Sequence, residues 1–115
     1  AMHLTQTPFV QLPTFEQGLG WQIYPLNPRK IYELLHPPSL MHVGPILAKP
    51  VFFFSRHYDA NNLMDKTGTT AGFRAYIAVI PSRQTGIVIL VNKRVSDGPL
   101  LRTARSILFK LNGMA

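Results

Sequence analysis

The sequence predicts an α+β fold in which a C-terminal helix packs on one face of a small antiparallel β-sheet. Two β-branched runs, 73–80 and 86–92, are joined by a short loop that contains proline and glycine, which is typical of a β-hairpin. Residues 100–111 follow with the apolar spacing of an amphipathic helix. The strands that we expect are residues 20–24, 70–80 and 86–92.

The first and last of these strands rest on different signals. Residues 20–24 form a short aromatic and β-branched run between a glycine-containing segment and Pro25. The last strand is apolar at every position from Ile87 to Val91, a pattern that predicts burial on both faces. The C-terminal helix can cover one face of the sheet. The sequence offers no evident cover for the other, so we expect an exposed sheet face and an unpaired edge that promote self-association.

The helix has start and stop signals of its own. Ser96 and Asp97 offer capping side chains, Pro99 suits the first turn, and Gly113 suits the end. The apolar stripe consists of Leu100, Leu101, Ala104, Ile107, Leu108 and Leu111. We expect the solvated face of this helix to carry Arg102, Arg105 and Lys110.

The 115 residues correspond to a single domain, 1–115, with a long proline-rich loop region at 26–62. Within that region, Ile31–Leu35 can form one or two helical turns. Val51–Phe54 is open to three interpretations: an edge strand, a buried strand, or a plug of aromatic side chains. Core packing is the favoured role for its three phenylalanines.

Composition excludes several classes of protein. Cysteine is absent, which removes disulfides, thiolate zinc sites and a cysteine nucleophile. No apolar run is long enough for a membrane-spanning helix. The net charge of +7 comes from scattered basic residues and few acids, and the four histidines lack the spacing of metal ligands. We therefore expect no nucleic-acid or membrane partner, no metal and no cofactor.

The stretch 65–73, DKTGTTAGF, is the most informative motif, and its setting makes it specific. Upstream lies GLGW at 18–21, and downstream come Tyr76, Ile80-Pro81, GIV at 86–88 and Asn92-Lys93. Together these motifs resemble the C-terminal part of class C serine β-lactamases and of related penicillin-recognising esterases and peptidases. The resemblance extends over roughly residues 15–112 and implies a partial β-lactamase/transpeptidase-like fold.

The resemblance also implies a substrate site. Lys66 would place a positive charge near the carboxylate of a β-lactam, ester or peptidoglycan-like substrate, and Thr67 would offer that carboxylate a hydroxyl. Gly68 would let the substrate lie close to the strand. The backbone N–H of Thr69 would be one of two oxyanion-hole donors.

The sequence departs from the family pattern in ways that bear on activity. None of its five serines begins a Ser-x-x-Lys motif, and Tyr58 is followed by Asp59 and Ala60 instead of completing Tyr-x-Asn. No catalytic residue is therefore assigned, and we expect the chain alone to be inactive. Asp65 stands where the family often has histidine. Asp97 and Leu100 stand where it often has asparagine and arginine, and a carboxylate there would repel an anionic substrate.

Two functions remain open. The chain is either part of a serine β-lactamase-like hydrolase that works through an acyl-serine, or a non-catalytic module that binds ligand or self-associates. Lactamases, esterases and peptidases share the motif, so the substrate class stays undecided. The family implies a periplasmic parent, although the first residues do not resemble an export signal.

Overall fold

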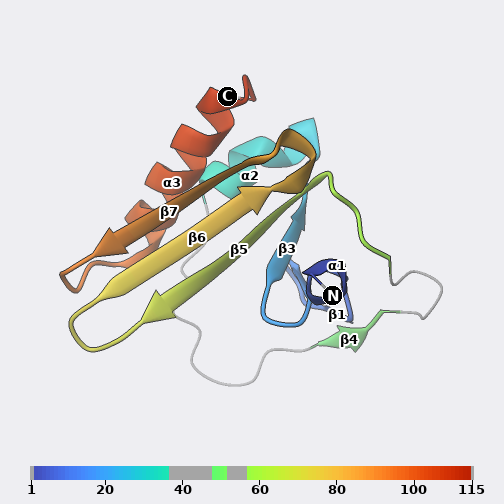
Figure 1. Ribbon diagram of the computed structural model, residues 1–115, viewed down its shortest axis with the longest axis horizontal. Helices are drawn as coiled ribbons and strands as arrows, with labels where there is room; N and C mark the ends of the chain where they lie inside the picture. The colour runs from blue at the N-terminus through green and yellow to red at the C-terminus, as the bar shows by residue number, and fades with distance from the viewer. Residues whose placement is uncertain (1, 37–47, 52–56, 115) are drawn as a thin grey trace.

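The computed structural model describes residues 2–36, 48–51 and 57–114, which form one antiparallel sheet with the helices Ile31–Leu35 and Asp97–Leu111 on one face (Figure 1). The strand order is β4-β1-β2-β3-β5-β6-β7. The strands are β1 (Val10–Gln11), β2 (Glu16–Gln17), β3 (Gln22–Pro25), β4 (Lys49–Pro50), β5 (Asn62–Thr69), β6 (Arg74–Ile80) and β7 (Thr85–Val91). The helices are α1 (Met2–Thr5), α2 (Ile31–Leu35) and α3 (Asp97–Leu111), with 3-10 turns η1 (Pro28–Lys30) and η3 (Pro81–Arg83). The expected fold class is confirmed.

The hairpin of β6 and β7 is the best-predicted element. Its strands begin and end within one residue of the expected 86–92 run and of the 73–80 run, and η3 followed by Gln84 joins them. Gln84 has φ 51°, a left-handed conformation that reverses the chain without a glycine. Gly86 lies two residues further on, where a Cβ would lie 2.9 Å from Val79 Cγ1.

The expected single strand at 70–80 is wrong. Residues 70–73 form a turn that is closed by a hydrogen bond from Thr70 N–H to the Phe73 carbonyl, 3.1 Å. The preceding residues form β5, so Lys66-Thr67-Gly68 lies near the end of one strand instead of opening another. Residues 62–69 carry few β-branched side chains, and pairing with both β3 and β6 makes them a strand despite that weak propensity.

The main core lies between the sheet and the helices α2 and α3, which occupy the same face (Figure 1). Its fully buried members include Leu63 and Tyr76 from the sheet and Leu101 and Leu108 from α3. The expected division of α3 into an apolar face and a solvated face is wrong at three positions. Ile107 and Leu111 are exposed, and Arg105, expected on the solvated face, is 1% exposed.

The opposite face of the sheet is covered only in part by the described residues. Ile23 and Met64 pair across β3 and β5 and are fully buried there. The N-terminal segment packs against this end of the sheet, because a Cβ on Gly18 would lie only 2.4 Å from the Thr5 carbonyl oxygen. Over β7 the face is open, with Val88 59% and Leu90 77% exposed. Burial of β7 on both faces is therefore a wrong expectation, and the expected exposed face is confirmed over β7 only.

The proline-rich region 26–62 is not loop throughout. It contains η1, α2 and β4, and α2 coincides with the helical turns expected at Ile31–Leu35. Pro28 occupies the first position of η1, where the missing N–H costs no hydrogen bond. Of the Val51–Phe54 segment, the three phenylalanines lie outside the described residues.

Candidate functional site

The last four residues of β5, 66–69, have a neighbouring strand on one side only within the described residues, and we call this stretch the ledge. β6 pairs with β5 as far as Thr69, whereas β3 pairs only with the first half, Asn62–Asp65. Among the described residues, no strand therefore lies along the outer edge of residues 66–69. Backbone groups on such an edge can bind a ligand in the manner of an added strand.

Lys66 and Thr67 direct their side chains to opposite faces of the sheet, because successive residues of a strand alternate. Lys66 is exposed and lies opposite Ile77 on the open face, while Thr67 is half-buried and lies opposite Tyr76 on the helix face. Lys66 Nζ donates to the Thr67 carbonyl, 2.7 Å. Backbone groups also alternate along a strand, so Thr67 and Thr69 direct theirs to the same side of β5.

Gly68 is not required by packing. A Cβ at this position would meet only Ala75 Cβ at 3.5 Å, an ordinary contact. Gly68 and Thr69 border a cavity of about 430 Å³ at the turn between β5 and β6. Its other lining residues include Phe73, Arg74, Leu90 and Asn92. The absence of a side chain at Gly68 thus opens the ledge toward this cavity.

Asp97 and Leu100, the positions where the family often has asparagine and arginine, occupy different environments in α3. Leu100 is buried in the core and cannot reach a substrate. Asp97 Oδ1 lies 3.9 Å from Arg74 Nε, and Arg74 Nη1 also donates to the Thr70 and Phe73 carbonyls. The charge of Asp97 is therefore offset by a cation that lines the cavity beside Gly68.

Directly before the ledge lies a buried polar cluster that the sequence reasoning missed. Arg105 Nη2 donates to Asp65 Oδ2 at 2.7 Å, and both side chains are 1% exposed. The Tyr76 hydroxyl donates to the same oxygen and accepts from Arg105 Nε at 3.1 Å. Arg105 Nη1 reaches the Leu34 carbonyl at 2.8 Å. The cluster joins β5, β6, α2 and α3.

Burial dominates the titration of this cluster. It raises the pKa of the Asp65 carboxyl, while the Arg105 guanidinium and the Tyr76 hydroxyl oppose that rise. It also raises the pKa of Tyr76, and the Asp65 charge adds to the increase. Two signals could have revealed the cluster: Arg105 follows Leu101 by one helical turn, and Asp65 lies two residues after Leu63 on the same face of β5.

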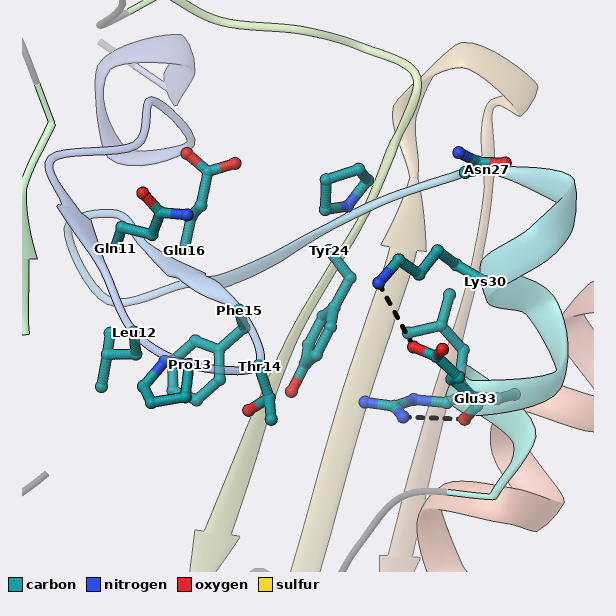
Figure 2. Close-up of a pocket in the computed structure, with 13 residues that line it drawn as sticks. Gln11, Leu12, Pro13, Thr14, Phe15, Glu16, Tyr24, Asn27, Lys30 and Glu33 are labelled. Atoms are coloured by element: carbon teal, nitrogen blue, oxygen red, sulfur yellow. Dashed lines mark hydrogen bonds and ion pairs between the residues drawn. The ribbon is translucent and has the colours of Figure 1, made fainter. Parts of the chain in front are cut away.

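A second cavity, of about 330 Å³, lies away from the ledge, between α2 and the turn that joins β1 to β2. Figure 2 shows the rings of Phe15 and Tyr24 on one side of it and the Lys30–Glu33 ion pair, 3.4 Å, on the other. Arg105 also lines it and lies 4.9 Å from the centre of the Tyr24 ring. The Asp65–Arg105 pair therefore borders this second cavity through Arg105.

Other classes of site find little support in residues 2–36, 48–51 and 57–114. None of their helices is both long and apolar enough to cross a membrane. Within the same ranges, no three histidine, aspartate or glutamate side chains gather as metal ligands would. The ledge on β5 remains the candidate site.

Comparison with known proteins relates this architecture to one group of enzymes. No protein-family model matches the chain. A β-lactamase of Pseudomonas fluorescens is 32% identical over 94% of the chain, and one of Escherichia coli is 32% identical over 93%. A solved class C β-lactamase mutant has a TM-score of 0.80 and 31% identity over 95% of the chain. A D-alanine carboxypeptidase of Burkholderia cenocepacia also has a TM-score of 0.80, with 25% identity.

The antiparallel sheet and its C-terminal helix define a β-lactamase-like α+β portion. More particularly, sequence and structure identify the chain as a class C β-lactamase-like portion. It spans about three tenths of the length of its relatives, 30% of the Pseudomonas fluorescens protein and 29% of the class C mutant.

Proposed function

We propose that the chain supplies the substrate-carboxylate and oxyanion element of a class C-like serine β-lactamase, whose parent protein hydrolyses β-lactams through an acyl-serine. The observation that carries the proposal is the free outer edge of residues 66–69, beside a cavity and next to an exposed lysine. We further propose a periplasmic location for the parent, which the family resemblance implies.

Each residue of the ledge has a role in this proposal. Lys66 attracts the carboxylate of the bound lactam, and the Thr67 hydroxyl donates to it once the side chain turns toward the edge. Gly68 lets the substrate lie close to the strand because it has no side chain. Packing within the chain does not itself require a glycine at this position. The Thr69 N–H shares its side of β5 with Thr67 and becomes an oxyanion donor. Loss of one such donor typically costs ~10²–10³ in rate.

The nucleophile must come from elsewhere, because no Ser-x-x-Lys occurs in the sequence. The reaction needs a serine hydroxyl to attack the lactam carbonyl, with its proton transferred to a base as the C–N bond opens. Incubation of the chain with benzylpenicillin should therefore leave the intact mass unchanged. A stoichiometric adduct would reveal a nucleophile within these 115 residues and overturn the assignment.

Ligand binding tests the ledge directly. We expect calorimetry to detect benzylpenicillin binding to the chain, and Lys66→Ala to weaken it about tenfold or more through loss of a charge-assisted hydrogen bond. Lys110→Ala is the matched control, because Lys110 is an exposed lysine on α3. Equal effects of the two variants would contradict the proposal. Addition of a relative's N-terminal fragment that carries Ser-x-x-Lys should then restore hydrolysis.

A second function, self-association, is favoured by the uncovered sheet face. Leu90, Val88 and Phe73 are each more than half exposed, and β7 is the last strand in the order of the described sheet. A long apolar edge of this kind tends to pair with another chain. We propose that a second copy covers it in the isolated chain, which sedimentation measurements can test.

A further inference from the structure

Arg105 is the point at which the helices are tied to the strand that carries the ledge. Its guanidinium bonds to Asp65 on β5, to Tyr76 on β6 and to the Leu34 carbonyl on α2, at 2.7 to 3.1 Å. It also lies against the Tyr24 ring on β3. One side chain of α3 therefore contacts three strands and a helix, and all of these contacts lie on the covered face of the sheet.

Asp65, the residue that Arg105 anchors, lies where β5 loses one of its two neighbouring strands. Asp65 is the last β5 residue that pairs with β3, through Gln22, and Lys66 is the first beyond that pairing. From this point the strand is held by β6 alone among the described residues. Because a strand alternates, fixing Asp65 on the helix face directs Lys66 to the open face.

We propose that Asp65 and Arg105 are positioning residues for the substrate ledge: their buried pair fixes the register and facing of Lys66–Thr69 at the point where β3 no longer supports the strand. This inference rests on the proposed function, since it assigns the ledge its purpose. It also explains Asp65 in place of the family's histidine, because the carboxylate has a matching cation on α3.

A contribution to folding stability does not by itself explain the buried Asp65–Arg105 ion pair. Asp65 Oδ1 is buried and has no hydrogen-bond partner among the described residues, so the carboxylate is only half satisfied. Well-packed apolar side chains often replace buried ion pairs with no loss of stability. A fork of directed hydrogen bonds, in contrast, fixes one orientation of the strand.

The test compares Asp65→Asn, which keeps the shape of the side chain and removes its charge, with Leu108→Ala. Leu108 is fully buried on α3 but has no part in the polar cluster. Hydrogen exchange of the backbone amides is measured by NMR in the free chain. We expect Asp65→Asn to lower protection at Lys66 and Gly68, whose amides face β6 when that of Thr69 faces the outer edge, about tenfold more than within β6. Leu108→Ala should lower both alike.

Equal loss of protection across β5 and β6 in Asp65→Asn would overturn the inference. Should that variant fail to fold, the same exchange measurement is made on Arg105→Lys, and we expect the same result. An ammonium keeps the charge but cannot bond to three partners in fixed directions. Benzylpenicillin calorimetry on the same proteins separates the two proposals. If benzylpenicillin binds the wild type and Lys66→Ala with equal affinity, the proposed function is rejected. The exchange data still decide whether Asp65 and Arg105 position the ledge.

Discussion

Arg105 shows how the environment of one residue decides the behaviour of several others. Its guanidinium is placed by helix spacing among Leu101, Ala104 and Leu108, and burial there requires compensation. Asp65 supplies the charge and Tyr76 supplies a hydroxyl that both donates and accepts. Removing either charged partner leaves the other buried and alone, which typically costs about 3–5 kcal/mol.

The titration of Tyr76 gives a prediction at the same scale. Burial raises its pKa above the ordinary 10.0, so the folded protein retains a proton that the unfolded chain releases in alkali. Its contribution is complete below that ordinary value and is lost as pH rises above it. We expect the free energy of unfolding to fall by up to about 1.4 kcal/mol per pH unit for this group.

Urea denaturation between about pH 8 and about pH 11 measures that slope. Tyr76→Phe should reduce the alkaline slope, although Tyr24, whose pKa burial also raises, retains its own contribution. Leu108→Ala is the control, since it lowers stability at every pH without removing a titrating group. An unchanged slope in Tyr76→Phe would show that the phenol has the same pKa in both states.

Individual elements differ in how far the sequence predicts them. The β6–β7 hairpin and α3 have strong local signals, namely β-branched runs, a turn with proline and glycine, and a helix with start and stop residues. β5 has no such local signal. It is a strand because it pairs with β3 on one side and β6 on the other. The same holds for the polar cluster, whose members lie up to 71 positions apart in sequence. The ledge residues could be named in advance, but their free edge could not.

The N-terminal segment contributes to the fold through a close approach at Gly18. A Cβ there would lie 2.4 Å from the Thr5 carbonyl oxygen and 3.1 Å from that of Thr7, both of them backbone atoms. Gly18→Ala must displace this segment, so we expect a loss of about 1–3 kcal/mol in the free energy of unfolding.

Gly72→Ala is a matched control, because nothing lies within 4 Å of a Cβ at Gly72. Urea denaturation should find the stability of this variant close to that of the wild type. A comparable loss in both variants would mean that chain flexibility, and not the contact with Thr5, sets the requirement for glycine.

The molecule as a whole has two unlike sides. Helices α2 and α3 cover one face of the sheet, while β6 and β7 leave the other face apolar and open (Figure 1). Among the described residues nothing covers this face over β7, so in the isolated chain we expect a second copy to pack on it.

Self-association of the isolated chain should therefore depend on the open face and not on exposed apolar residues in general. Leu90 on β7 and Leu111 on α3 are almost equally exposed, 77% and 72%, but lie on opposite sides of the sheet. We expect sedimentation velocity to show dimers or larger species that Leu90→Lys shifts toward monomer, since a charge on the patch resists burial. Leu111→Lys should leave the distribution unchanged. A wild type that stays monomeric at every concentration, or a loss of association in both variants, would contradict a role for the β7 face.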